Sequence, residues 1–269
     1  MDDLTTLTRN PIKARLARDE LSVSMSVRIL RGHEIGHIAA NAGFDTLYVD
    51  LEHSVLSLET TAAICHAARA AGVVPLVRLP ALEPALIGRV LDGGAMGLIL
   101  PHVESAASAR AAVVAARYPP DGARSVGTGQ PLLHYRQFPT AQACEAMNQA
   151  IFIAAMIESG AGLAAADEIA AVDGVDMLFV GTHDLGIELC WPAGDDEKVI
   201  AAYRQVLAAA AKQGKFVGAG GVANRPALIG RLIRLGVRLI SAGTDLSFLS
   251  VGAAQSCAAI TRAASAAGD

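Results

Sequence analysis

Two carboxylates that follow two apolar runs, Glu158 and Asp184, are the residues in this sequence best placed to do chemistry. The runs, residues 151–157 and 177–180, are continuously apolar, as expected for parallel strands covered on both faces. Carboxylate oxygens are the ligands that hard divalent cations prefer. The pair therefore predicts a site for Mg²⁺, Mn²⁺ or Co²⁺, with Zn²⁺ as a further candidate. Taken singly, Glu158 could instead cap the following helix, and Asp184 could be an N-cap.

An arginine and a histidine follow two further apolar runs. Arg78 ends the run 73–78, and His53 comes shortly after the run 45–50. A guanidinium is a permanent planar cation suited to a carboxylate or a developing enolate oxygen, and an imidazole exchanges protons near neutral pH. We therefore predict anion stabilisation by Arg78 and proton transfer by His53. The alternatives are an ion pair at the rim for Arg78 and a partly buried, hydrogen-bonded histidine for His53.

Three more polar residues, Asp92, His102 and His183, stand near the ends of predicted elements. Asp92 ends a helix, where the helix dipole disfavours an acid, so we expect it to have a partner far away in the sequence. His102 and His183 follow predicted strands, and we expect them to line the pocket or to support the ligands. Together with His53 they leave a mixed zinc-type site open as an alternative.

Several reaction classes are excluded by residues that the sequence lacks or misplaces. The four lysines include one, Lys215, at the entry of a predicted strand. That is the wrong end of a barrel for catalysis, so a Schiff-base lysine is not expected. The sequence has no G-x-S-x-G elbow and no P-loop. Carbon–carbon chemistry would therefore need a metal as its electron sink. The four cysteines are scattered, and we expect buried free thiols in a reducing cytoplasm.

Composition narrows the class of protein. Of 269 residues, 52% are hydrophobic and 18% are charged, which supports an ample buried core. The net charge of −4 offers no basic patch, so nucleic acid is not an expected partner. The N-terminus lacks the layout of a signal peptide, and no apolar run is long enough to span a bilayer. We expect a cytoplasmic protein that binds no membrane.

Eight apolar runs alternate with helix-like segments, without a linker-like break. The predicted strands cover residues 21–27, 45–50, 73–78, 97–101, 151–158, 176–180, 215–219 and 237–241. This pattern predicts one (β/α)8 TIM barrel domain over residues 1–269, with a short leading helix near residues 10–19. Its strand exits would meet at one mouth. A doubly wound open sheet, the competing fold, would show fewer strands and a glycine fingerprint after the first. Residues 118–131 carry loop chemistry and are expected to form a functional loop.

Five motifs, in matching order and spacing between residues 20 and 250, resemble those of a known family. They are Val49–His53, Val77–Pro80, Gly97–Pro101, Met156–Ser159 and Val180–Leu185. The family is the HpcH/HpaI aldolases, metal-dependent class II pyruvate aldolases. The resemblance implies a (β/α)8 barrel whose last helix is exchanged between subunits, in a homohexamer built as a trimer of dimers.

The resemblance also assigns roles to individual residues. It makes Glu158 and Asp184 the metal ligands, Arg78 the enolate-stabilising arginine and His53 the catalytic histidine. Asp92 becomes the aspartate paired with that histidine, which would supply the distant partner expected for it.

The same resemblance places substrate near the segment after the sixth strand. Backbone amides of the segment Gly181, Thr182, His183 and Asp184 would receive the carboxylate of pyruvate, as at a helix N-terminus. Here the segment reads G-T-H-D-L-G, where the family usually has G-P-x-D-L-S. The loop Arg124–Gly129 also departs from the commoner R-G-x-G form. Both segments flank the substrate, so the identity of the aldehyde stays open.

These observations predict a divalent-metal-dependent aldolase. It would cleave or form 4-hydroxy-2-oxo acids, giving pyruvate or a related 2-oxo acid plus an aldehyde. One alternative is an acyl-CoA lyase of the citryl- or malyl-CoA type, which would need a cationic platform for the nucleotide, and the sequence has no clustered Lys/Arg stretch. The other alternative is a non-catalytic barrel that binds a metal or a 2-oxo acid.

Overall fold

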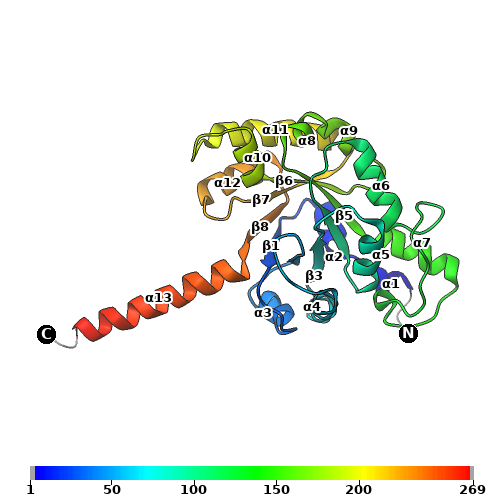
Figure 1. The fold of residues 1–269 in the computed structure, drawn as a ribbon, viewed down its shortest axis with the longest axis horizontal. Helices are drawn as coiled ribbons and strands as arrows, with labels where there is room; N and C mark the ends of the chain where they lie inside the picture. Colours follow the sequence, from blue (N-terminus) through cyan, green and yellow to red (C-terminus); the bar gives the residue numbers. More distant parts are fainter. Residues whose placement is uncertain (1–3, 267–269) are drawn as a thin grey trace.

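The computed structural model describes residues 4–266 and shows a closed barrel of eight parallel strands in sequence order, β1 to β8 (Figure 1). The strands are β1 Ser22–Val27, β2 Thr46–Asp50, β3 Val74–Arg78, β4 Gly97–Leu100, β5 Phe152–Ile157, β6 Met177–Gly181, β7 Phe216–Gly220 and β8 Leu239–Thr244. The predicted (β/α)8 barrel is confirmed, and the doubly wound sheet is excluded because β1 pairs with β8.

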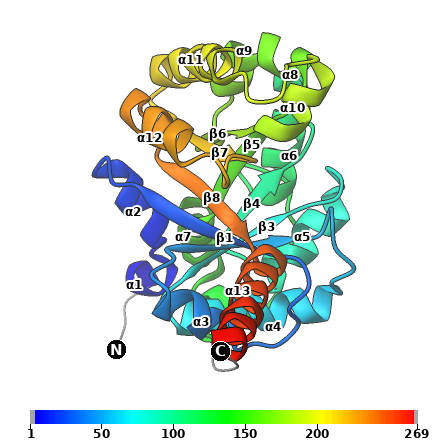
Figure 2. The same ribbon diagram turned by 90° about the vertical axis from the view of Figure 1, so that its left-hand side faces the viewer.

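Helices surround the strands, and one further helix, the last, projects away from them (Figures 1 and 2). They are α1 Leu4–Thr8, α2 Pro11–Ala17, α3 Ile35–Asn41, α4 Leu58–Ala70, α5 Pro84–Asp92, α6 Ala106–Ala116, α7 Thr140–Ala150, α8 Gly160–Ala164, α9 Ala166–Ala170, α10 Thr182–Glu188, α11 Asp196–Lys212, α12 Pro226–Leu235 and α13 Asp245–Ala266. A 3₁₀ turn covers Pro131–Leu133. Two local features stand out. The segment after β5 forms two short helices, α8 and α9, and α10 follows β6 without a loop.

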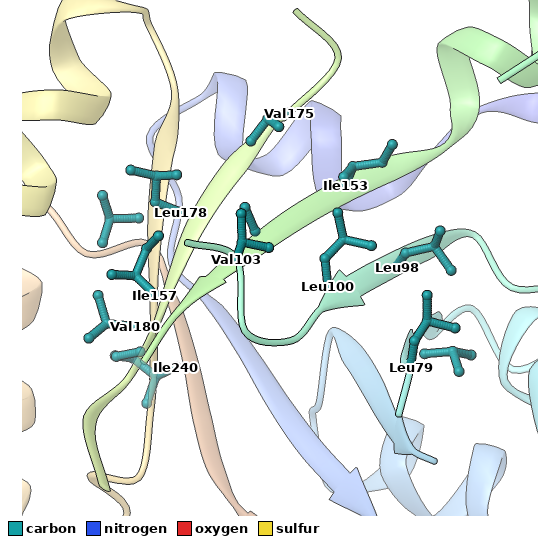
Figure 3. Close-up of a cluster of buried hydrophobic side chains, with 14 of the residues drawn as sticks. Leu79, Leu98, Leu100, Val103, Ile153, Ile157, Val175, Leu178, Val180 and Ile240 are labelled. Atoms are coloured by element: carbon teal, nitrogen blue, oxygen red, sulfur yellow. The ribbon is translucent and has the colours of Figure 1, made fainter. Parts of the chain in front are cut away.

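Two cores form because successive side chains of a strand point to opposite faces. Leu98, Ile153 and Leu178 point outward and pack beneath the helices (Figure 3). Phe152 and Phe179 point inward and help to fill the barrel. Both faces of each strand are therefore buried, which is why the strands read as continuous apolar runs.

The leading segment covers the bottom of the barrel. The Asn10 side chain is buried and donates to the carbonyls of Met96 (3.0 Å) and Ala150 (2.7 Å). Its own side-chain oxygen accepts from Ile12 N and so caps α2, as this residue type commonly does. Helix α2 lies within the residues 10–19 that were expected to form a leading helix, and it is shorter than that range.

The irregular segment at residues 118–131 is also confirmed, and its start is fixed by one buried side chain. Asn148 on α7 accepts from Tyr118 N (2.7 Å) and donates to Tyr118 O (2.9 Å). The Arg124 guanidinium lies over the Tyr118 ring at 4.6 Å from its centroid. These contacts hold the loop against the outside of the barrel.

The last helix, α13, projects away from the barrel (Figures 1 and 2). Of its residues only Asp245 is buried, and several large apolar side chains are exposed: Leu246, Phe248, Leu249, Val251 and Ile260. Within residues 4–266, no helix combines the length and the apolar character that crossing a bilayer requires.

The cysteines are all free but differ in exposure. Cys65 and Cys144 are buried, and burial raises the pKa of the Cys65 thiol to about 12. Cys190 and Cys257 are exposed. The expectation of buried thiols was therefore wrong for these two, because one follows the short helix α10 and the other lies on the projecting α13.

Candidate active site

The inner face of the barrel carries polar side chains at the carboxyl ends of its strands. Asp50, Arg78 and Glu158 each come two residues after a side chain of the interior core: Tyr48, Leu76 and Met156. Because strand side chains alternate between faces, all three point toward the barrel axis, one layer above the apolar filling. Asp50 and Arg78 are also opposite each other in the β2–β3 register.

These side chains open into one cavity of about 410 Å³. Its lining includes four of the residues to which sequence analysis gave a chemical role: His53, Arg78, Glu158 and Asp184. The segment of β6 and α10 expected to receive substrate, residues 181–184, also lines it. The carboxyl-terminal mouth of a (β/α)8 barrel is where such enzymes place their active sites.

Arg78 is buried at this mouth and is held by two acids. Its Nε donates to Asp50 Oδ1 (2.9 Å) and its Nη2 to Asp50 Oδ2 (2.6 Å), while Nη1 lies 2.8 Å from Glu52 Oε2. Burial alone would lower the pKa of Arg78, but the hydrogen bonds and charges of these acids raise it above the usual arginine value. Arg78 is thus ion-paired, as the alternative expected. The same side chain also lines the cavity.

Asp50 holds the charged groups of the site together, and sequence analysis assigned it no role. Its fully buried carboxylate accepts from Arg78, from Arg28 Nε (2.7 Å) and from the backbone N–H groups of Glu52 (3.1 Å) and His53 (3.2 Å). Burial would raise the pKa of Asp50, but the hydrogen bonds and charge of Arg78 outweigh it and lower this pKa. Its position at the end of the predicted strand 45–50 was the signal present in the sequence.

Glu158 is buried, and one of its oxygens is held in place. Oε1 accepts from the backbone N–H of His102 (2.7 Å). Burial raises the pKa of Glu158, and the charge of Glu52 adds to this effect. The capping alternative is wrong, because the hydroxyl of Ser159 accepts from Gly162 N and caps α8.

Asp184 lies in the first turn of α10 and is exposed in the cavity. The N-cap position belongs to Gly181, which has no side-chain cap, so the N-cap alternative for Asp184 is wrong. Gly181 also has a steric role. A Cβ at this position would lie 2.8 Å from Glu158 Cβ and 2.9 Å from Glu158 Oε2. The glycine therefore leaves the space that the Glu158 carboxylate occupies.

Two histidines flank the acids. His53 is 49% exposed at its side chain, with Nε2 4.0 Å from Glu52 Oε2, so it is not the partly buried, hydrogen-bonded histidine of the alternative. His102 has a left-handed backbone (φ 49°), which is uncommon for a non-glycine residue. Its ring lies between Glu52 Oε1 (2.9 Å from Nε2) and Glu158 Oε1 (3.1 Å from Nδ1). His102 therefore supports a predicted metal ligand, while His183 lines the cavity.

Asp92 lies outside this cavity. Its carboxylate accepts from Arg124 Nη2 (2.6 Å) and Gln130 Nε2 (3.2 Å), and it lines a separate groove between α5 and α6. The expected distant partner exists, but within residues 4–266 it is Arg124, and no hydrogen bond or ion pair joins Asp92 to His53.

The donor set suits a hard cation completed by other ligands. The described residues contain no group of three or more His, Cys, Asp or Glu that could hold a metal, so they form no zinc site of three protein ligands. Glu158 and Asp184 supply carboxylate oxygens to one cavity, and a cation of the Mg²⁺ or Mn²⁺ type commonly takes one or two carboxylates plus water and substrate oxygens.

Comparisons with known proteins point to one family of aldolases. The model of the HpcH/HpaI aldolase/citrate lyase family matches residues 30–250. A 4-hydroxy-4-methyl-2-oxoglutarate aldolase of Hapsidospora irregularis is 37% identical, over 93% of this chain and 94% of its own length. A hydroxypyruvate/pyruvate aldolase of Roseovarius nubinhibens is also 37% identical, over 82% and 85%. The crystal structure of an HpcH/HpaI aldolase from Desulfitobacterium hafniense superposes with a TM-score of 0.86 at 31% identity, covering 93% and 96%.

Proposed function

Because the chain belongs to the HpcH/HpaI aldolase/citrate lyase family and is an aldolase, a carbon–carbon lyase, we propose that its substrates are 4-hydroxy-2-oxo acids. Cleavage would give pyruvate or a related 2-oxo acid plus an aldehyde or ketone. One observation carries this proposal: His53, Arg78, Glu158 and Asp184 line a single cavity at the barrel mouth. The aldolase names of the relatives support it.

Aldolases of this family are generally dependent on a divalent metal ion, and we propose that Glu158 and Asp184 hold it here. A bound cation would supply a Lewis acid for the keto oxygen and carboxylate of the substrate. Mg²⁺, Mn²⁺ and Co²⁺ all suit carboxylate ligands. The raised pKa of Glu158 fits this role, since a buried carboxylate with few partners gains most from a neighbouring cation.

The chain's own residues account for charge and proton movement. In cleavage, the C4 hydroxyl gives its proton to His53, or to a water that His53 holds, and the C4–O bond becomes a carbonyl. The C3–C4 bond breaks, and its electron pair forms the enolate of the 2-oxo acid. Arg78, fixed beforehand by Asp50 and Glu52, stabilises the enolate oxygen. A proton delivered to C3 then completes the 2-oxo acid.

The substrate carboxylate has a receptor in the start of α10. The first helical residues, Thr182, His183 and Asp184, follow Gly181 directly. N–H groups in a first turn lack intrahelical acceptors and favour an anion. We therefore assign the carboxylate of the 2-oxo acid to this segment, which contains Asp184 and lies against Glu158 at Gly181.

We further propose that the whole chain acts as one domain of a cytoplasmic homo-oligomer, a hexamer by family resemblance, in which α13 is exchanged between subunits. The exposed apolar side chains of α13 support this arrangement, because soluble proteins seldom expose a long apolar helix face. The position of Asp92 fits as well. Its side chain is 46% exposed in a separate groove, so it could serve His53 only from a neighbouring subunit.

A panel of 4-hydroxy-2-oxo acids, assayed for pyruvate release with Mg²⁺, Mn²⁺, Co²⁺ and Zn²⁺, tests the proposed function. We expect metal-dependent release that EDTA abolishes and added metal restores. A non-catalytic binding barrel would release no pyruvate with any metal. That result, from protein shown to be folded by circular dichroism, would overturn the proposal.

A further inference from the structure

Resting on this proposed function, we propose that Arg28, at the exit of β1, binds a second carboxylate carried on C4 of the substrate. Arg28 lines the cavity together with Arg78, but the mechanism above does not use it. The enzyme would then prefer 4-hydroxy-2-oxo acids in which the carbon released as a carbonyl also bears a carboxylate. The carbonyl product would itself be a 2-oxo acid.

The backbone that carries Arg28 is clamped by a buried acid. Asp245, the first residue of α13, is 2% exposed. Its carboxylate accepts the N–H groups of Arg28 (3.0 Å), Ile29 (2.9 Å) and Leu30 (2.8 Å). Three charge-assisted hydrogen bonds to one side chain fix the turn after β1. The backbone at Arg28 is therefore held in place by the Asp245 carboxylate.

The side chain of Arg28 is anchored at one nitrogen and free at the others. Nε donates to Asp50 Oδ2 at 2.7 Å, and this is the one hydrogen bond of its guanidinium within residues 4–266. Arg28 is 35% exposed at its side chain, whereas Arg78 is 5% exposed. Nη1 and Nη2 therefore have no hydrogen-bond partner among the described residues, and the side chain that carries them lines the cavity. An arginine fork held at Nε is suited to bind a carboxylate through its two outer nitrogens.

Asp50 also fixes where this second carboxylate would lie. Its Oδ2 binds Arg28 Nε (2.7 Å) and Arg78 Nη2 (2.6 Å) at once, so the two guanidiniums are direct neighbours. Arg78 is assigned to the oxygen on C2, and C4 is two bonds from C2. A carboxylate bonded to C4 therefore lies within reach of the Arg28 guanidinium. A carboxylate at the far end of a long chain would lie beyond it.

The surroundings of Arg28 are polar rather than apolar. Ser26, Ser241 and Thr244 line the same part of the cavity, and the hydroxyls of Ser26 and Ser241 lie 3.2 Å apart. A charged substituent there would exchange its hydrogen bonds with water for hydrogen bonds with these hydroxyls. An alkyl chain would find few apolar contacts. The pocket around Arg28 thus favours a small charged group.

Two substrates that differ at one position test this inference. 4-Hydroxy-4-methyl-2-oxoglutarate carries a carboxylate on C4, where 4-hydroxy-2-oxopentanoate carries hydrogen. We expect the wild-type enzyme to favour the carboxylated substrate by about 10–100-fold in kcat/KM, the usual weight of a charge-assisted hydrogen-bond pair. Arg28→Gln should reduce this ratio to near one, mainly through KM, and Arg28→Lys should restore part of it. Arg31→Gln, an exposed arginine of the same loop outside the cavity lining, is the matched control.

Each result is decisive. Equal loss on both substrates in Arg28→Gln would show that Arg28 only supports Asp50, and it would overturn the inference while leaving the proposed function intact. A wild-type enzyme without preference between the two substrates would overturn it in the same way, even if the variant failed to fold. Cleavage of neither substrate by folded, metal-supplemented wild-type enzyme would instead refute the proposed function, and the inference with it.

Discussion

Asp50 accepts hydrogen bonds from Arg78 at both carboxylate oxygens, Oδ1 from Nε at 2.9 Å and Oδ2 from Nη2 at 2.6 Å. Both residues are buried. Glu52 engages the third nitrogen, Nη1. The arginine is therefore oriented before any substrate arrives, and only its remaining N–H groups are available to a ligand. Donors fixed in advance stabilise developing charge without reorganisation, which is the main source of their catalytic effect.

Replacing Arg78 should affect rate and stability together. We expect Arg78→Ala to lower kcat/KM by about 10²–10³, because the enolate loses a fixed cation. Unfolding in denaturant should show a loss on the order of 3 kcal/mol, since Asp50 and Glu52 remain buried without their main partner. Arg110→Ala, on the exposed face of α6, is the control and should leave both quantities unaltered. Turnover near the wild-type value in folded Arg78→Ala would contradict the assigned role.

Gly181→Ala should displace Glu158 without straining the backbone. The φ of Gly181 is −83°, so alanine is allowed there, but its Cβ would lie 2.8 Å from Glu158 Cβ. We expect about 10–100-fold weaker metal binding by isothermal titration calorimetry, the usual effect of disturbing the support of a ligand. Gly88→Ala, on α5 with no heavy atom near its added Cβ, is the matched control. Unchanged metal affinity in Gly181→Ala would show that Glu158 does not bind the metal.

Much of this arrangement could be predicted from the sequence, because strands covered on both faces must be apolar throughout and their polar exits must meet at one mouth. His53, Arg78, Glu158 and Asp184 were found on that basis. The role of Asp50 could not be predicted from the sequence. Its partners lie 22 and 28 residues away, and the contacts depend on the register of three strands.

Other features could not be predicted from the sequence, also for physical reasons. The start of helix α10 was misplaced, because Thr182 begins the helix directly after β6 with no turn signal between them. Asp92 ends a helix, and that position indicates a distant partner without saying which. The partner proved to be Arg124, because the loop that carries it packs beside Asp92. Arg28 directly follows the predicted strand 21–27 but was assigned no role, because its unbonded nitrogens are known only from the contacts of its side chain with Asp50.

The raised pKa of Glu158 predicts a pH-dependent gain from Glu158→Gln. Burial favours the protonated acid, so without metal the ionised form destabilises the native state at pH values above the raised pKa. The variant should therefore melt at a higher temperature than wild type at pH 7.5 in EDTA. As the pH falls toward the usual glutamate value, the wild type takes up its proton and the difference should vanish.

Adding Mg²⁺ or Mn²⁺ should make the wild type melt at a higher temperature than Glu158→Gln at pH 7.5. A ligand that binds only the native wild type raises its stability by mass action. Thermal unfolding followed by circular dichroism measures both effects. A variant that is less stable than wild type in EDTA at neutral pH would show that the Glu158 charge is already compensated by the protein. The desolvation of Glu158 would then not be the cause of metal dependence.

The projecting helix α13 offers a test of assembly that leaves the active site untouched. Leu249 and Ile260 are 59% and 72% exposed, so glutamate at either position should not destabilise a single chain. If α13 packs against a neighbouring subunit, the buried charge should instead break the oligomer, at a cost of several kcal/mol per interface. We expect sedimentation velocity to show smaller species for the double variant Leu249→Glu/Ile260→Glu. Ile187→Glu, equally exposed on α10, should sediment as wild type, and an unchanged assembly in the double variant would mean that α13 is not exchanged.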